Sequence, residues 1–271
     1  MSDFLDEMMR VGLRRVAEVR PTLADLESRA KSAPPPLPLE IAGPGFDVIA
    51  EAKLASPSEG RLVIGDDGSD AVMSLAHVYA ESGAAAISIL TEETRFAGSL
   101  AHLEAVAESC SAPVMRKDFL VDPVQILEAR AHGASGVLLI ARMLTRSLLE
   151  EMTDLALAHG MFVVVEVFGR DDLDTAAHVL DREVVVGVNS RDLATLEVDP
   201  GRFATVAPYL PDHLPAMAES GLASVDDVVG VVALGYRLAL VGSSLVTDSR
   251  PGAHLGRLIT AGRAALTGAS P

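Results

Sequence analysis

Charged side chains stand at the ends of several short apolar runs of this chain. Glu51 and Lys53 end the run VIAEAK at 48–53, and Lys117 follows the run APVMR. Strand side chains alternate, so Glu51 and Lys53 would share one face. Glu166 lies within VVVEVF, where an unpaired carboxylate between apolar neighbours is costly and needs a cationic partner. Ammonium groups beside carboxylates favour general acid–base chemistry.

Two later apolar runs also end in polar residues. Asn189 and Arg191 follow EVVVGV, and Glu219 and Ser220 follow HLPAMA. Each of these could be an ordinary solvated strand end when taken alone. Three cations and three carboxylates that converge on one rim form an acid–base constellation, which favours a catalytic role. The candidate catalytic residues are Glu51, Lys53, Lys117, Glu166, Asn189 and Arg191.

Glycine and serine follow the last two apolar runs, in AESGLAS at 218–224 and LVGSSLV at 240–246. Backbone N–H groups left open at short helix N-termini form the usual phosphate site of barrel enzymes. We therefore expect a phosphate site here, with a pair of tight glycine turns as the alternative. The chain carries 22 Lys plus Arg against 38 Asp plus Glu, a formal charge of −16, so local geometry must hold the anion.

The apolar runs that position these groups number eight, and helix-like segments separate them. Several of those segments end in a glycine, which takes the left-handed conformation at little cost. These glycines are Gly83, Gly133, Gly160 and Gly235. Runs of Val, Ile and Leu without clean alternation are typical of parallel strands covered on both faces. The pattern predicts an α/β fold, a (β/α)8 TIM barrel over residues 46–271.

A doubly wound parallel sheet is the rival fold. It would usually show G-x-G-x-x-G after the first strand, whereas GPGFDV at 43–48 precedes that strand. Helix starts are marked at Asp122, Thr145 and Ser224. Residues 1–45 are expected to form an N-terminal helical cap, with one or two amphipathic helices within 3–30 and a proline-rich connector over 31–45.

The composition excludes several classes of protein. A net charge of −16 excludes nucleic-acid binding through general basicity. The single cysteine, Cys110, excludes an internal disulfide, and no apolar stretch approaches the roughly 18 residues of a membrane span. The seven histidines lack H-E-x-x-H spacing, so we expect no metal site. These features predict a cytoplasmic protein without membrane or nucleic-acid partners.

Long segments of the chain resemble indole-3-glycerol phosphate synthase, a lyase of tryptophan biosynthesis. The similarity covers nearly the whole chain. The most specific segments are VMRKDFLVDPVQILEARAHGASGVLLIARML at 114–144 and VGVNSRDLATLEVD at 186–199. The resemblance implies conversion of 1-(2-carboxyphenylamino)-1-deoxyribulose 5-phosphate to indole-3-glycerol phosphate. Carbon dioxide and water are lost, and no cofactor is required.

The resemblance also implies roles for the candidate catalytic residues. Lys117 matches the general acid, while Glu166 and Glu51 match acid–base carboxylates. Lys53 matches a cation that steers the substrate carboxylate. Asn189 and Arg191 match residues that orient the ribulose hydroxyls, and Glu219 and Ser220 lie nearby. The division of labour among Glu51, Lys53, Lys117 and Glu166 stays open.

Further residues are expected to bind the substrate. Those matching phosphate-holding positions are Ser56, Gly221, Gly242 and Ser243. Those suited to wall an anthranilate ring are Phe96, Phe119, Leu138, Leu193 and Leu240. Plain barrel packing is an equal alternative for Leu138 and Leu240.

A few positions depart from the pattern of the family. Leu54 stands where a basic residue is common, and Glu59, Ala52 and Phe168 also differ from the usual residues. Leu54 and Glu59 motivate one alternative, a specialised paralogue that acts on a ring-substituted substrate. A non-catalytic barrel scaffold is the alternative from another class. We expect a monomer or a weak homodimer that binds a phosphorylated small molecule.

Overall fold

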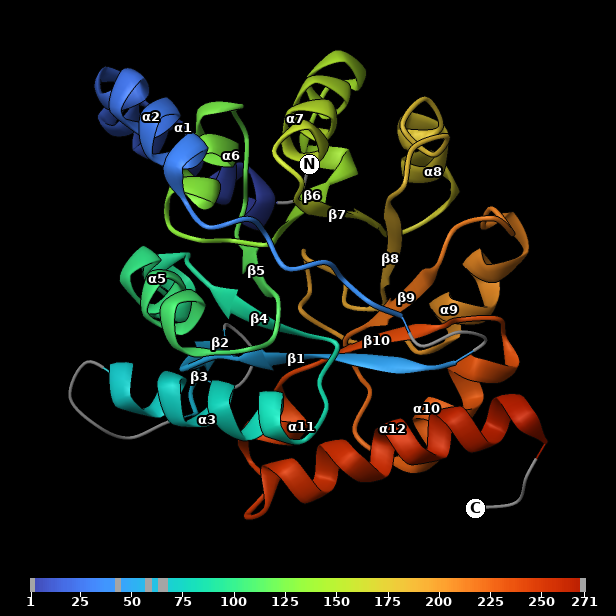
Figure 1. Ribbon diagram of the computed structural model, residues 1–271. Helices are drawn as coiled ribbons and strands as arrows, with labels where there is room; N and C mark the ends of the chain where they lie inside the picture. Colours follow the sequence, from blue (N-terminus) through green and yellow to red (C-terminus); the bar gives the residue numbers. More distant parts are fainter. Residues whose placement is uncertain (1–2, 42–44, 57–59, 63–67, 269–271) are drawn as a thin grey trace.

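The computed structural model describes residues 3–41, 45–56, 60–62 and 68–268. Its centre is a closed barrel of parallel strands in the hydrogen-bonded order β1-β10-β9-β8-β7-β6-β5-β4. Helices surround the strands on the outside (Figure 1). The eight predicted apolar runs are the eight barrel strands, so the predicted TIM barrel is confirmed.

The barrel strands are short and almost entirely buried. They are β1 (Asp47–Ala52), β4 (Ala86–Leu90), β5 (Val114–Lys117), β6 (Gly136–Ile140), β7 (Phe162–Val167), β8 (Val185–Asn189), β9 (Ala216–Glu219) and β10 (Leu238–Val241). Both faces are covered, by the barrel interior and by the helices, which explains their continuous Val, Ile, Leu and Ala composition. An antiparallel pair, β2 (Ala55–Ser56) and β3 (Gly60–Arg61), follows β1.

Helices alternate with the strands along the chain. They are α1 (Asp3–Val19), α2 (Leu23–Ser32), α3 (Ser69–Glu81), α4 (Glu93–Phe96), α5 (Leu100–Ser109), α6 (Val124–Ala131), α7 (Arg146–Ala158), α8 (Arg170–Ala176), α9 (Gly201–Val206), α10 (Val225–Ala233), α11 (Ser243–Val246) and α12 (Pro251–Thr267). The four glycines predicted at helix ends all have positive φ, between 74° and 98°. None of the helices within the described ranges is long and apolar enough to cross a membrane.

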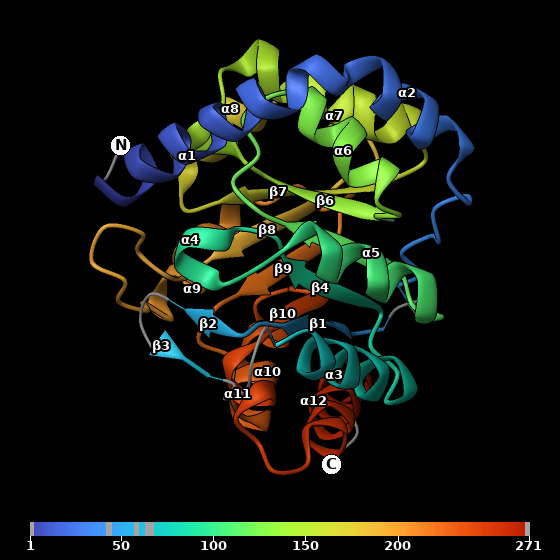
Figure 2. The same cartoon turned by 90° about the vertical axis from the view of Figure 1, so that its left-hand side faces the viewer.

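The predicted N-terminal extension is confirmed as α1 and α2, joined by a 3-10 turn at Arg20–Thr22. Leu5, Met8 and Val16 of α1 are buried against the barrel. Arg15 of α1 makes an ion pair of 2.9 Å with Asp118, which follows β5. Figure 2 shows the N-terminal end of α1 on the same side of the barrel as β2, β3 and α4. The extension therefore reaches the rim at which the strands end.

The predicted helix starts are also present. Thr145 accepts a hydrogen bond from the N–H of Leu148, and Asp122 accepts one from the N–H of Val124. At α10, Ser224 and Asp227 form a reciprocal capping box.

Replacement of Ser224 by Ala is expected to lower the free energy of unfolding by about 1 kcal/mol, because the N–H of Asp227 loses its acceptor. Urea denaturation followed by circular dichroism measures the change. The exposed Ser249→Ala is the control and should leave stability unchanged. Equal stability of Ser224→Ala and the parent chain would contradict the assigned cap.

Candidate active site

A cavity of about 450 Å³ opens at the C-terminal ends of the barrel strands. All the site residues predicted from the sequence line it, with the exception of Leu138. They are Glu51, Lys53, Ser56, Phe96, Lys117, Phe119, Glu166, Asn189, Arg191, Leu193, Glu219, Ser220, Gly221, Leu240, Gly242 and Ser243. The barrel therefore brings side chains from the ends of all eight strands, and from the loops that follow them, into one opening.

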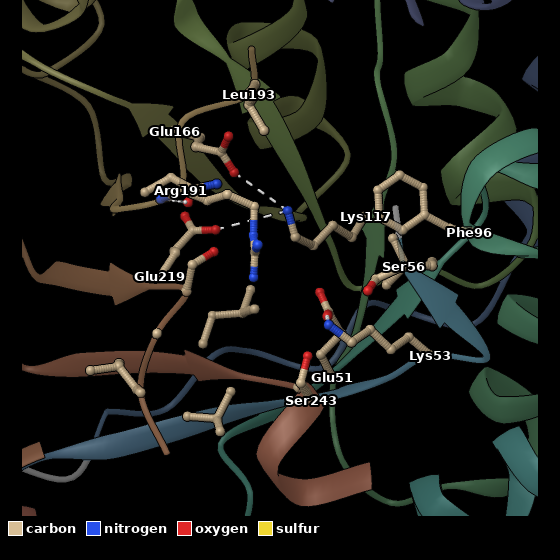
Figure 3. A pocket seen from close by; sticks show the side chains of 18 of the residues that line it. Glu51, Lys53, Ser56, Phe96, Lys117, Glu166, Arg191, Leu193, Glu219 and Ser243 are labelled. Carbon is tan, nitrogen blue, oxygen red and sulfur yellow. Dashed lines mark hydrogen bonds and ion pairs between the residues drawn. The ribbon is translucent and has the colours of Figure 1, made fainter. Parts of the chain in front are cut away.

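Lys117, the last residue of β5, points into this cavity between two carboxyl groups (Figure 3). Its Nζ lies 3.4 Å from Oε2 of Glu166 on β7 and 3.8 Å from Oε2 of Glu219 on β9. Burial lowers the pKa of Lys117, but the carboxylates of Glu166, Glu219 and Glu51 outweigh burial, and the net pKa is raised. Lys117 therefore carries its proton at neutral pH and can donate it to an oxygen in the cavity.

The carboxyl group of Glu219 has a strongly raised pKa. Burial raises its pKa well above the usual value, and the neighbouring Glu166 raises it further, although Lys117 acts in the opposite direction. Within the part of the chain that the structure describes, no N–H, hydroxyl or ammonium group donates a hydrogen bond to Glu219, and the carboxyl of Glu166 is its hydrogen-bonding neighbour. Glu219 therefore keeps its proton to a higher pH than an ordinary glutamate.

Glu51 and Lys53 form a second charged pair at the opening. Nζ of Lys53 lies 3.3 Å from Oε1 of Glu51. Glu51 is buried, and its carboxyl lies over Gly242 at the end of β10, where a Cβ atom would come within 2.5 Å of Oε1. Figure 3 shows Ser243 beside Glu51, so the acidic group borders the expected phosphate region.

Asn189 and Arg191 hold the loop that follows β8. Oδ1 of Asn189 accepts a hydrogen bond of 2.9 Å from the N–H of Arg191, and the guanidinium of Arg191 donates to the carbonyl of Leu196 at 2.7 Å. The loop brings Leu193 and Leu196 to the cavity as apolar wall. Arg191 thus orders this wall through its contact with the backbone.

The expected phosphate region is built from the two turns after β9 and β10. Ser220 and Gly221 both have positive φ, 68° and 73°, which turns the backbone sharply at the end of β9. Ser244 donates a hydrogen bond of 3.1 Å to the carbonyl of Leu222 and so joins the two turns. Gly242 and Ser243 line the same side of the cavity.

An aromatic wall closes another side of the cavity. The ring centroids of Phe96 and Phe119 lie 6.1 Å apart, and Phe4 of α1 packs edge-on against Phe119 at 5.7 Å. Phe4 lines the cavity and was not predicted from the sequence. The amphipathic pattern of residues 3–30 predicted a helix there, but it contained no signal for the surface that the helix contacts.

Leu138 does not line the cavity among the described residues, which corrects the prediction for this position. It is fully buried, and its register partner on β7 is Val164, whereas Ile140 is the partner of Glu166. Leu138 therefore lies one inward-facing layer deeper in the barrel. Ile140, two residues later on the same face, lines the cavity in its place.

Three of the unusual positions lie outside the cavity lining. Leu54 is buried and packs against Gly68, where a Cβ atom would come within 2.4 Å of Cδ1. Phe168 is buried beneath the guanidinium of Arg142, 4.0 Å from its ring centroid, and Ala52 is part of β1. Glu59 lies outside the described residues. The unusual residues at positions 52, 54 and 168 therefore leave the charged groups of the cavity intact.

Comparisons with known proteins identify the family of the chain. The family model for indole-3-glycerol phosphate synthase matches residues 10–258. A protein of that name from Mycobacterium avium is 45% identical over 243 residues, which cover 89% of this chain and 87% of the relative. One from Mycobacterium tuberculosis is 44% identical over 247 residues, 90% of this chain and 89% of the relative.

The fold of this chain is similar to that of solved structures. A 3-hexulose-6-phosphate synthase from Salmonella typhimurium superposes with a TM-score of 0.63 at 14% identity, over 80% of this chain and 98% of that one. At this identity the likeness shows the barrel alone. The family match and the identity to the mycobacterial relatives go further: the chain belongs to the indole-3-glycerol phosphate synthase family.

Proposed function

We propose that this protein converts 1-(2-carboxyphenylamino)-1-deoxyribulose 5-phosphate to indole-3-glycerol phosphate, with loss of carbon dioxide and water. The observation that carries the proposal is the Lys117 ammonium held between the carboxyl groups of Glu166 and Glu219 in a cavity with one apolar wall. The family of the chain agrees with this reaction. Neither alternative, a paralogue for substituted rings or an inactive scaffold, gains support from the comparisons.

The cavity offers a surface for each part of this substrate. The turns at Ser220–Gly221 and Gly242–Ser243 suit the phosphate, which backbone N–H groups and hydroxyls bind well. The aromatic wall suits the anthranilate ring. The cation of Lys53 suits the substrate carboxylate. The substrate would then span the cavity with its ketone near Lys117.

The reaction needs proton transfer at two stages. A ring carbon attacks the ketone, a carbon–carbon bond forms, and the carbonyl oxygen takes a proton from Lys117 as it becomes a hydroxyl. Carbon dioxide leaves with cleavage of the bond to the ring, whose electrons restore aromaticity. The hydroxyl then leaves as water with a proton from an acid, while a base removes a proton from the new five-membered ring. Glu166, Glu51 and Glu219 are the groups placed for these later transfers.

Incubation of the purified protein with the carboxyphenylamino substrate tests the proposal. We expect indole fluorescence to appear together with one carbon dioxide per product. Rates with ring-substituted substrates separate the main proposal from the specialised paralogue. Absence of both signals at saturating substrate would refute the proposal. We further expect activity without an added cofactor, and gel filtration should show a monomer or a weak homodimer.

Phe4 is expected to contribute to substrate binding. Replacement of Phe4 by Ala should raise KM by about tenfold or more, because an aromatic side chain contributes roughly 1.5–3 kcal/mol when it is buried against an apolar surface. The value of kcat should change little, since the charged groups stay in place. Steady-state kinetics measure both constants. Leu13→Ala, an exposed position on the same helix, is the control, and an unchanged KM in Phe4→Ala would exclude the contact.

A further inference from the structure

The carboxyl group of Glu219 is buried, and among the described residues no N–H, hydroxyl or ammonium group donates a hydrogen bond to it; its hydrogen-bonding neighbour is the carboxyl of Glu166. The ammonium of Lys117 lies 3.8 Å from Oε2, longer than a hydrogen bond. A buried carboxyl in such a setting has many rotamers open to it unless its surroundings restrict them. The packing of the neighbouring residues must therefore help to hold the carboxyl group of Glu219 in place.

The space occupied by the carboxyl exists because position 187 in β8 has no side chain. A Cβ atom added to Gly187 would lie 2.1 Å from Oε1 of Glu219 and 3.1 Å from Cγ1 of Val164. Gly187 is the register partner of Glu166 on β7, whereas Glu219 is level with Asn189. The side chain of Glu219 therefore extends past the backbone of Gly187, where no Cβ atom stands in its way. Its carboxyl group lies at the height of Glu166 in the barrel, one layer away from the register position of its own Cα.

We propose that Gly187 is a positioning residue whose missing side chain brings the carboxyl of Glu219 beside that of Glu166 and into reach of Lys117. The inference rests on the proposed function, because it assigns the acid–base chemistry to this group of three side chains. Two carboxyl groups held this close share a proton and titrate as a pair. Gly187 would thus allow Glu166 and Glu219 to form a pair of carboxyl groups that keeps one proton in the cavity.

Charged groups on several strands face Glu219 and influence its protonation. They are Glu166 on β7, Lys117 on β5 and Glu51 on β1, with Lys53 and Arg191 lining the same cavity. Burial and the two other carboxyl groups favour the neutral form of Glu219, and Lys117 favours the charged form. The influences that raise the pKa of Glu219 outweigh that of Lys117. Moving the carboxyl of Glu219 away from all of these groups and toward solvent should therefore lower its pKa.

Replacement of Gly187 by Ala moves this carboxyl without breaking the barrel. Gly187 lies in a regular strand and is not among the residues with positive φ, so an alanine backbone is allowed. The closest clash is with the far end of the flexible Glu219 side chain, which can rotate away. The added Cβ would lie 3.1 Å from Cγ1 of Val164, so this side chain must also shift slightly.

The first experiment uses the protein without substrate and so does not depend on activity. Infrared spectroscopy in heavy water follows the carbonyl band of the protonated carboxyl as the pH is raised, and Glu219→Gln identifies the band. We expect the band to disappear about one pH unit lower in Gly187→Ala than in the parent chain. An unchanged midpoint would overturn the positioning role.

The second experiment is a kinetic double-mutant cycle. Gly187→Ala should lower kcat about 100-fold in the parent chain, since small misplacements of catalytic groups carry such costs. In the Glu219→Ala background, the same change should cost less than about threefold, because the displaced carboxyl is already absent. Equal costs in both backgrounds would overturn the proposal, because Gly187 would then act independently of Glu219.

Gly136→Ala in β6 is the matched control for a glycine replaced in a barrel strand. Its added Cβ would lie 2.3 Å from the ring of Phe162, so it should lower the melting temperature. Its infrared midpoint and the pH dependence of kcat should match those of the parent chain. If the parent chain had no synthase activity while the infrared shift appeared, the proposed function would fail and the positioning of Glu219 by Gly187 would stand.

Discussion

Replacement of Lys117 by Met is expected to lower kcat by about 1,000-fold, with a much smaller effect on KM. Lys117 is the ammonium group in contact with Glu166 and Glu219, and its raised pKa keeps it protonated through neutral pH. General acids typically contribute 100- to 10,000-fold to a rate. Methionine preserves most of the side-chain volume, so the loss should come from the missing proton donor.

Single-turnover kinetics with saturating substrate measure this loss directly. Lys31→Met on α2 is the control, since that position lies outside the cavity. Removal of the cation should also raise the pKa of Glu219 further, because Lys117 opposes the effects of burial and of Glu166 on that carboxyl group. A kcat within a few-fold of the parent value would show that another group donates the proton.

The charged part of this site could be predicted from sequence because burial of charge is costly. Glu166 lies among valines in the sequence, and that conflict alone indicated a cationic partner, which the structure identifies as Lys117. The barrel topology predicted that the charged groups lie close together, since parallel strands present their C-terminal ends at one rim. The alternation of strand side chains also predicted that Glu51 and Lys53 share one face, and in the structure Nζ of Lys53 lies 3.3 Å from Oε1 of Glu51.

The depth of apolar residues in the barrel was harder to predict. Leu138 and Ile140 share a face of β6, so alternation could not decide which of them reaches the cavity. The register with β7 decides it, because Ile140 is level with Glu166. Register depends on the strand stagger around the whole barrel, which a single sequence does not contain.

Contacts distant in sequence and missing side chains were not predicted at all. Phe4 contacts Phe119, which lies 115 positions later in the chain, and the helical pattern around Phe4 shows only that one face is buried. Gly187 looked like one more residue of an apolar strand. Its effect comes from the space that it leaves for Glu219, and empty space is visible only in three dimensions.

The strand that carries Lys117 also carries a fully buried arginine. Arg116 points away from the cavity and donates to Thr91 at 3.0 Å and to the carbonyl of Gln125 at 3.0 Å. It pairs with Asp118 at 3.1 Å and with Glu128 of α6 at 2.8 Å. Lys117 and Arg116 thus use the two faces of one strand, one for chemistry and one for anchoring.

Replacement of Arg116 by Met is expected to lower the free energy of unfolding by about 3–5 kcal/mol, because it removes the ion-pair partner of the buried Glu128 and leaves the buried Asp118 with Arg15 alone. That is a large share of the roughly 5–15 kcal/mol available to a folded domain. Urea denaturation followed by circular dichroism measures it. Arg95→Met, which removes an exposed ion pair with Glu7, should cause little change.

Acid stability provides an independent measurement of the same network. Burial raises the pKa of Asp118, but Arg116 and Arg15 outweigh it and hold the pKa at about 2, below its usual value of 3.8. A carboxylate with a lowered pKa stabilises the fold above its unfolded-state pKa, and this contribution is lost as the pH falls toward the folded-state value. In the parent chain that loss falls between the two pKa values.

In Arg116→Met the pKa of Asp118 rises, so acid unfolding should begin at a higher pH. Because Asp118 also binds Arg15, an unchanged acid transition in Arg116→Met would show that Arg15 alone suffices to keep the pKa of Asp118 low.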